Sequence, residues 1–188
     1  LSFSKAAKEA DADVITVADS PLARTRADSF LVAARIKREV GIDVLPHLSC
    51  RDRNHIAVKG TLLGGAMEGI RNVLAITGDP IIPLENGVSK GVFTFNSYRL
   101  ISYIKSLSED VLAASPYAVG GALNVNAERF DAELKRAVKK VECGAQFLLT
   151  QPIFTRQAEE NLRKARNALS CKLLAGIMPV AGYKNALF

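Results

Sequence analysis

Short runs of aliphatic residues recur along the chain, and each follows a stretch with helical spacing. The runs are nearly continuous in hydrophobicity rather than alternating, which is typical of parallel strands covered on both faces. The sequence therefore predicts six strands, over residues 13–18, 43–48, 72–77, 117–123, 146–150 and 172–178.

Helical patterns separate these strands. The clearest covers residues 126–143, where apolar side chains recur at spacings of three and four and charged side chains occupy the other faces. Two more helices are predicted over residues 23–40 and 155–169. Ser97 and Thr155 are predicted to be helix N-caps, because their hydroxyl oxygens can accept hydrogen bonds from free backbone amides.

The order of helix, glycine and strand repeats along the chain. Gly41, Gly69 and Gly144 each precede a predicted strand, where a helix C-terminus favours a residue that tolerates positive φ. Such repeats are typical of βα units, and they fit either a doubly wound sheet or a barrel. Because the chain opens on a helix and closes on a strand and loop, we favour a (β/α)8 barrel without its first and last strands. Residues 1–188 would then form one barrel domain, truncated at both ends.

Every predicted strand ends in hydrogen-bonding residues, which is where either architecture places a ligand. His47 is either a satisfied polar residue of the interior or a donor to a cofactor oxygen. Asp79 is either a turn residue or a carboxylate that stabilises a cationic intermediate. Gln151 is an ordinary strand-end residue, or it offers a donor and an acceptor to a planar heterocycle. Cys50 is interpreted as a small buried residue, since no base is placed to activate it.

Composition narrows the classes of protein. With 48% hydrophobic residues the chain can bury one sizeable core, and no apolar run approaches the roughly 20 residues of a membrane span. Three scattered cysteines and two histidines argue against a zinc site or a disulfide scaffold, and we expect a cytoplasmic protein. The net charge is +6, but the basic residues are interleaved with acidic ones rather than clustered among aromatic residues. This pattern favours anionic small molecules over nucleic acid as binding partners. The common nucleotide-binding and hydrolase motifs do not occur, which leaves a cofactor held by the strand ends or an acid–base enzyme.

The chain carries five linked motifs: His47–Asn54, Gly69–Pro80, Gly121–Asn124, Gly144–Pro152 and Gly176–Val180. Together they resemble the methylenetetrahydrofolate reductase family, and their order and spacing match from about Asp13 onward. The resemblance is especially close to the reductase half of bifunctional homocysteine methyltransferase and reductase proteins, and to reductases of anaerobic bacteria. It implies a flavin, FAD or FMN, over the carboxyl ends of a (β/α)8 barrel. It also implies ping-pong hydride transfer from NADH or NADPH to 5,10-methylenetetrahydrofolate, with 5-methyltetrahydrofolate as product.

The resemblance also implies roles for individual residues. Asp79 would be the catalytic residue, stabilising the 5-iminium cation of the folate. Gln151 would bind the pterin, and Tyr183 would lie against folate or nicotinamide. Lys140 would contact the phosphate region of the dinucleotide. The full set of implied cofactor contacts is His47, Thr77, Gly78, Asp79, Ala122, Asn124, Asn126 and Lys140.

Five positions differ from the better-known bacterial reductases, all on the flavin side. Val17 and Ala18 replace a threonine and a tyrosine, Thr77 replaces an arginine, and Ala122 and Asn126 replace an aromatic residue and a histidine. These differences leave FAD and FMN both open. The family's proton-donating glutamate lies on the first strand, which we expect to precede this sequence.

Three functional hypotheses follow from the sequence. The leading one is the reductase itself, as a homo-oligomer, with a partner subunit or a fused methyltransferase domain as further possibilities. The second is a flavin-binding electron-delivery subunit that needs a partner for NAD(P)H oxidation. The third is an aldolase-type or synthase-type barrel without flavin.

Overall fold

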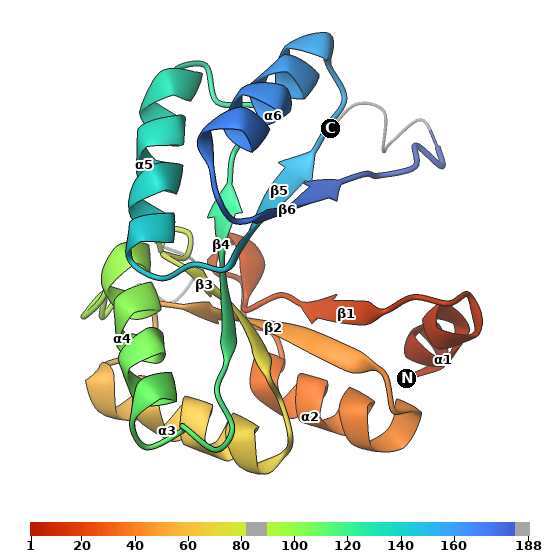
Figure 1. The fold of residues 1–188 in the computed structure, drawn as a ribbon. Helices are drawn as coiled ribbons and strands as arrows, with labels where there is room; N and C mark the ends of the chain where they lie inside the picture. The colour runs from red at the N-terminus through yellow and green to blue at the C-terminus, as the bar shows by residue number, and fades with distance from the viewer. Residues whose placement is uncertain (82–89, 183–188) are drawn as a thin grey trace.

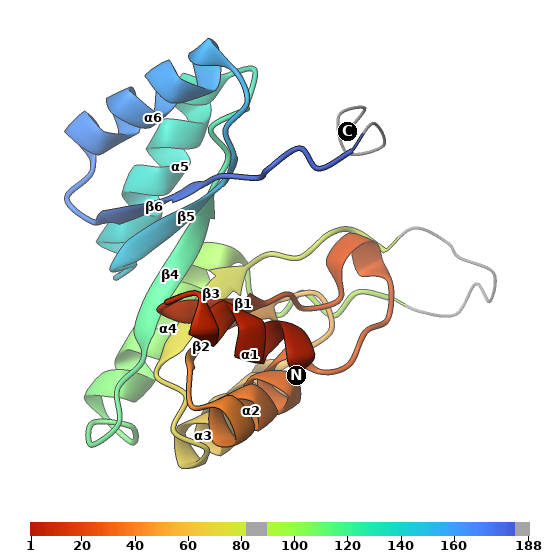
Figure 2. The same cartoon turned by 90° about the vertical axis from the view of Figure 1, so that its right-hand side faces the viewer.

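Six parallel strands form one sheet in the computed structural model, which describes residues 1–81 and 90–182. Each strand pairs with the next one in the sequence, and the sheet curls with the helices on its outer face (Figures 1 and 2). The strands are β1 (Val14–Val17), β2 (Asp43–Ser49), β3 (Asn72–Ile76), β4 (Ala118–Leu123), β5 (Phe147–Pro152) and β6 (Lys172–Gly176). This curled parallel sheet is part of a (β/α)8 barrel, so the predicted fold class is confirmed.

The helices of the described residues alternate with these strands, and all but the first pack their apolar faces against the outer face of the sheet to form one hydrophobic core. Residues on the outer face of β2 and β3, such as Val44, Leu48 and Val73, are almost fully buried in it. The helices are α1 (Ser2–Glu9), α2 (Ser29–Val40), α3 (His55–Met67), α4 (Ser97–Glu109), α5 (Phe130–Glu142) and α6 (Arg156–Ala168), with a 3-10 turn η1 at Pro21–Ala23.

Helix ends agree with the sequence at most positions. Gly41, Gly69 and Gly144 adopt φ of 68°, 75° and 110°, and the Thr155 hydroxyl accepts a hydrogen bond from the Ala158 amide, as predicted. The prediction of Ser97 as an N-cap was wrong by one residue. The cap is Asn96, whose side-chain oxygen accepts from the Arg99 amide.

Two helices begin later than predicted. The helix expected from residue 23 begins at Ser29, because the Asp28 carboxylate accepts from the amides of Phe30 and Leu31 and so caps α2. The helix expected from residue 126 begins at Phe130. Both errors fall in loops at the carboxyl ends of strands, where the chain must turn before the helix can start. These loops build the site described below.

Residue alternation along each strand decides which side chains face the inside of the curl. Since Val44 and Leu48 belong to the core beneath the helices, His47 and Ser49 face inward. Strand pairing aligns His47, Leu74, Gly120 and Phe147 in one row across the sheet. The Phe147 ring occupies the space that a Cβ at Gly120 would need, so this glycine allows the aromatic ring to fill the inside.

Candidate functional site

The loops after β1, β2 and β3 meet at one end of the sheet. The turn after β1 reaches the loop after β3 through a hydrogen bond of 2.6 Å, in which the Leu22 amide donates to Oδ2 of Asp79. Ser20 and Leu22 both adopt left-handed backbone conformations, with φ of 43° and 56°. The Asp79 side chain is otherwise exposed, so its carboxylate lies at the surface of this rim with one oxygen held by a backbone amide.

Arg51 lies beneath this contact and is only 2% exposed. Its guanidinium donates twice to the Asp52 carboxylate, at 2.8 and 2.7 Å, and Nη1 donates to the backbone oxygen of Ser20 at 3.1 Å. The hydrogen bond to Asp52 raises the pKa of Arg51, and the charges of Asp52, Asp19 and Asp79 act in the same direction. Arg51 therefore joins the loop after β2 to the turn after β1.

A second charged group ties the same loops together. Oδ2 of the buried Asp19 accepts from the Ser49 amide at 2.9 Å and from Arg53 at 2.6 Å, and Arg53 also donates to Asp28 at 2.9 Å. Sequence reasoning assigned no role to Asp19, Arg51 or Arg53. The dense alternation of charge in Arg51-Asp52-Arg53 directly after a buried strand was the available signal for them.

Two polar atoms inside the curl have no hydrogen-bond partner among the described residues. They are Nε2 of His47 and Oγ of Ser49, both buried. Burial lowers the pKa of His47, and the Asp19 carboxylate partly opposes this shift, so the neutral imidazole is favoured near neutral pH. Because buried polar groups are normally paired, these two atoms mark a place where a polar ligand or water would bind.

Gly78 supports the loop that carries Thr77 and Asp79. Its φ is 87°, and an added Cβ would come within 3.0 Å of the Cβ atoms of both Ser49 and Arg51. Only glycine combines this conformation with such close packing. The loop therefore lies directly against the end of β2 and exposes Thr77 and Asp79 at its surface.

The predicted residues on β4 and its loop form a separate group. Nδ2 of Asn126 donates to the backbone oxygen of Pro152 at 3.1 Å, and its amide donates to the Asn124 side chain at 2.9 Å. Asn126 therefore connects the end of β4 to the end of β5. Ala122 is exposed on the inward face of β4 and leaves that face open.

Lys140 lies in the wall of the barrel rather than at its rim. The side chain is on α5, only 8% of the residue is exposed, and Nζ donates to the backbone oxygen of Ala122. Its other neighbour is the Glu133 carboxylate, at 3.9 Å. Burial lowers the pKa of Lys140, while the charge of Glu133 opposes that shift. Contact with a phosphate would require the amine to leave these partners.

Gln151 is exposed at the end of β5, where the pairing with β6 shifts register. The Thr150 hydroxyl bridges this irregularity by accepting a hydrogen bond from the Gly176 amide and donating one to the Gln151 backbone oxygen, both at 2.8 Å.

Two further residues singled out in the sequence are Tyr183 and Cys50. Tyr183 lies outside the described residues. Cys50 is fully buried, and burial raises the pKa of its thiol to about 12, which agrees with the structural interpretation of this residue.

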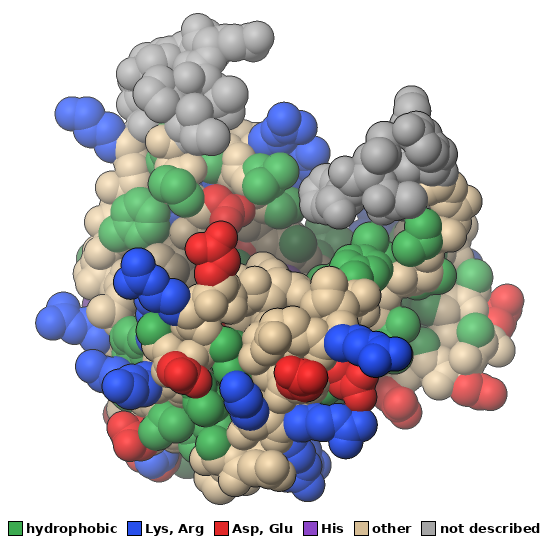
Figure 3. Space-filling model, turned by 90° about the horizontal axis from the view of Figure 1, so that it is seen from above, with side chains coloured by type: hydrophobic (Ala, Val, Ile, Leu, Met, Phe, Trp, Pro, Cys, Tyr) green, Lys and Arg blue, Asp and Glu red, His purple; other side chains and the backbone are tan. Residues whose placement is uncertain are grey.

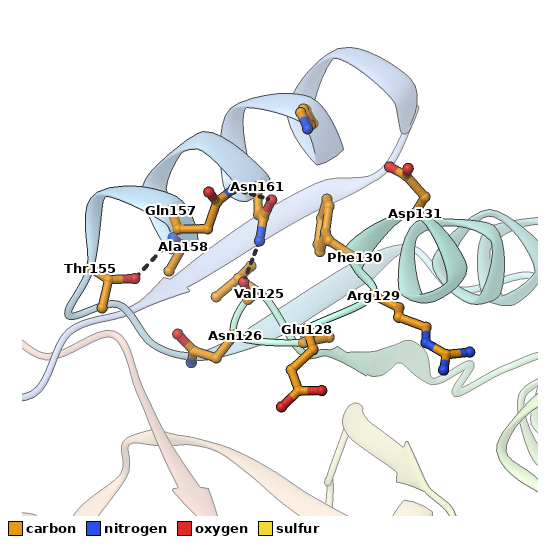
Figure 4. A pocket seen from close by; sticks show the side chains of 12 residues that line it. Val125, Asn126, Glu128, Arg129, Phe130, Asp131, Thr155, Gln157, Ala158 and Asn161 are labelled. Carbon is orange, nitrogen blue, oxygen red and sulfur yellow. Dashed lines mark hydrogen bonds between the residues drawn. The ribbon is translucent and has the colours of Figure 1, made fainter.

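A cavity of about 610 Å³ lies beside this rim, between the starts of α5 and α6 (Figure 4). Asn161 of α6 is nearly buried and donates to the Val125 oxygen, and this bond holds the floor of the cavity. Of the predicted site residues that lie in the described ranges, only Asn126 lines it. The cavity therefore adjoins the described part of the predicted site at one residue without containing it.

Charged side chains of both signs are interspersed on the face seen from above (Figure 3).

Among the described residues there is no group of three His, Cys, Asp or Glu side chains that could hold a metal ion. Within the same ranges, no helix is long and apolar enough to cross a membrane.

Comparison with known proteins identifies the family. The model of the family described as methylenetetrahydrofolate reductase matches residues 2–188. The chain belongs to this family. A 5,10-methylenetetrahydrofolate reductase of Buchnera aphidicola is 27% identical over 83% of the chain and 50% of its own length. A methylenetetrahydrofolate reductase (NADH) of Arabidopsis thaliana is 26% identical over 83% of the chain and 28% of its own length.

Another relative is a probable methylenetetrahydrofolate reductase (NADPH) of Caenorhabditis elegans, 25% identical over 84% of the chain and 23% of its own length. The chain thus spans half or less of these family members. Among solved structures, a 2,3-dimethylmalate lyase superposes with a TM-score of 0.65 at 14% identity, over 95% of the chain and 62% of the lyase. At that identity the likeness concerns the barrel fold alone.

Proposed function

We propose that the protein to which this chain belongs reduces 5,10-methylenetetrahydrofolate to 5-methyltetrahydrofolate with NADH or NADPH, using a bound flavin in a ping-pong reaction. The observation that carries the proposal is the match of the reductase family model to residues 2–188. Relatives named for NADH and for NADPH both match the chain, so the proposal covers either donor.

The inward face of β2 fits a planar polar cofactor such as FAD or FMN. His47 and Ser49 present an imidazole nitrogen and a hydroxyl that are buried without partners among the described residues. A neutral imidazole can donate one hydrogen bond and accept another, which suits the alternating carbonyl and nitrogen edge of a flavin. Bound flavin would supply the hydride chemistry, and the chain's residues would hold and orient it.

Thr77, Gly78 and Asp79 would border the flavin from the end of β3. Because Gly78 packs tightly against Ser49 and Arg51, the loop has little room to move inward, and its exposed side chains stay at the rim. Ala122 leaves the inward face of β4 open to a ring, and Asn124 and Asn126 offer amide groups beside it. These residues would orient the cofactor and exclude water from one of its faces.

Asp79 would stabilise the iminium cation that forms when the methylene bridge of the folate opens. A carboxylate that is fixed before the reaction stabilises a developing cation without the cost of reorganising. Gln151, exposed on the neighbouring rim, would donate to and accept from the pterin ring, which has an amide-like edge.

The test uses the full-length protein purified with its cofactor. We expect flavin absorbance that NADH or NADPH bleaches under anaerobic conditions and that 5,10-methylenetetrahydrofolate restores. Stopped-flow absorbance follows the two half-reactions separately. A colourless protein that binds neither FAD nor FMN would refute the proposal.

A flavin-binding electron-delivery subunit is the second candidate. It is favoured by the position of Lys140, because the residue predicted to contact the dinucleotide donates to Ala122 inside the wall. Such a subunit would be reduced by a partner rather than by NAD(P)H directly. Oxidation of NADH by the full-length protein with an artificial electron acceptor, in the absence of any partner, would exclude this candidate.

A further inference from the structure

We infer that the turn after β1, residues 20–23, is a positioning device that holds the Asp79 carboxylate in place through the Leu22 amide, and that Arg51 anchors this turn. We refer to residues 20–23 as the Leu22 turn. The inference rests on the proposed function, since it assigns the turn to the step in which Asp79 acts. It adds a backbone group and an arginine to the residues that the sequence motifs suggested.

The first observation is the contact itself. The Leu22 amide lies 2.6 Å from Oδ2 of Asp79, although the two residues are 57 positions apart in the sequence. Asp79 belongs to an exposed loop, where a carboxylate would otherwise sample several rotamers. A hydrogen bond to one oxygen fixes where the carboxylate lies, and the other oxygen, which accepts no hydrogen bond from the described residues, stays available to a cation.

The second observation is that the Leu22 turn has a strained backbone and that its exposed leucine side chain packs little against the protein. Leu22 and Ala23 both adopt φ of 56°, and Ser20 adopts φ of 43°, which residues with a Cβ rarely do. The Leu22 side chain is 64% exposed, so no burial of that side chain compensates for the strained conformation. Strain of this kind persists where surrounding contacts determine the conformation, and here one of those contacts is with Asp79.

The third observation identifies the anchor. Arg51 donates to the Ser20 oxygen while its guanidinium is held by both oxygens of Asp52. The same side chain packs against Gly78, the residue before Asp79. Arg51 therefore touches both sides of the contact, the turn that carries the amide and the loop that carries the carboxylate. Because the guanidinium is almost fully buried, its position is fixed by these partners.

The backbone amide is tested by two substitutions at one exposed position in the full-length holoprotein. Leu22→Pro removes the N–H and cannot adopt φ of 56°, so it abolishes the contact. Leu22→Gly keeps the N–H and readily adopts positive φ, so this variant should behave like the wild type. We expect Leu22→Pro to slow reoxidation by 5,10-methylenetetrahydrofolate roughly 10- to 100-fold while flavin reduction by NAD(P)H changes less than about threefold.

Arg51 is tested independently of the turn. Arg51→Met removes the bond to Ser20, and Arg51→Lys keeps the charge but loses the two-pronged contact with Asp52. Both should slow the folate half-reaction selectively, with Arg51→Lys retaining more activity. Thermal melting of each variant, with its bound flavin content, separates a positioning effect from loss of the fold.

Hydrogen exchange of the Leu22 amide gives a readout that needs neither substrate nor turnover. If Asp79 accepts from this amide in solution, Asp79→Ala should accelerate its exchange at least about tenfold, because the amide loses its acceptor. The amide of Arg26, which donates to the Ser20 hydroxyl in the same turn, is the internal control and should change much less.

The inference is overturned if Leu22→Pro slows both half-reactions equally, if Leu22→Gly is as slow as Leu22→Pro, or if Asp79→Ala leaves Leu22 exchange unchanged. Failure of the proposed function has a different signature. The wild-type protein would then show no reoxidation by the folate at all, while the exchange experiment would still report whether the contact exists.

Discussion

The loops after β1, β2 and β3 are joined mainly by charged side chains, whereas the ends of β4, β5 and β6 are joined by an amide side chain, a hydroxyl and backbone groups. On the first side, Asp19 and Arg53 form a nearly buried ion pair and Arg51 is fixed by Asp52. On the second side, Asn126 bonds to the Pro152 oxygen and Thr150 to the Gly176 amide.

The two sides would therefore have different roles in the proposed reaction. Buried charges are costly unless their geometry is held, so we expect the charged contacts of the first side to hold the loops around the Asp79 carboxylate in place. The second side offers neutral donors and acceptors, which suit an uncharged heterocycle such as a pterin. The four predictions below test this contrast, from the largest expected effect to the smallest.

Asp79→Asn should produce the largest effect on catalysis. The amide is isosteric and keeps an oxygen for the Leu22 amide, but it lacks the charge that stabilises a cation. Reoxidation by 5,10-methylenetetrahydrofolate should fall roughly 10²- to 10³-fold, with flavin reduction nearly unchanged. Anaerobic stopped-flow measures both steps, and Asp13→Asn, at an exposed carboxylate before β1, is the matched control. Equal slowing of the two steps would remove Asp79 from its assigned role.

Arg53→Met should strongly reduce stability, because it leaves the Asp19 carboxylate buried without its ionic partner. A loss of about 3 kcal/mol in the free energy of unfolding is expected. Arg163→Met, at the exposed pair that Arg163 forms with Glu159, should cost less than about 0.5 kcal/mol. Urea denaturation measures both. Similar losses for the two variants would mean that the charged side is not the more tightly held one.

Gly120→Ala tests the inside of the curl between the two sides. The added methyl group would overlap the Phe147 ring, so the ring must move, at a cost of about 1–3 kcal/mol in unfolding free energy. Gly60→Ala in α3 is the matched control, since its Cβ would meet no atom within 4 Å, and it should stabilise the helix by roughly 0.5–1 kcal/mol. A neutral Gly120→Ala would show that Phe147 does not fill this space.

His47 should give the smallest effect, a pH dependence of stability. Burial lowers its folded-state pKa below the unfolded value of about 6.5, so the unfolded chain binds the extra proton first. The stability linked to this group is therefore complete above about pH 6.5 and decreases as pH falls toward the folded-state pKa. The free energy of unfolding, taken from denaturation curves between pH 5 and about 7.5, should fall in this way as pH falls in the wild type but not in His47→Gln. His55→Gln, at an exposed histidine, is the control.

The strands were predictable because buried parallel strands appear in the sequence as short, nearly continuous runs of hydrophobic residues. Each of the six predicted runs became a strand with ends shifted by at most two residues. Helix starts were predicted less well. The helix expected from residue 23 starts at Ser29 because the choice of cap depends on a loop conformation that apolar spacing does not encode.

The sequence by itself determined the parallel order of the elements and the family, and it predicted His47, Asp79 and Gln151 as site residues at strand ends, because these inferences depend on local periodicity and short motifs. Only the tertiary structure decided which groups those residues meet. It joined Asp79 to the Leu22 amide, buried Arg51 between two loops, and directed Lys140 into the wall. The physical reason is that such contacts depend on how the sheet curls and how its strands align. That geometry brings together loops that are far apart in the chain, and the local sequence of one loop does not indicate which other loop it contacts.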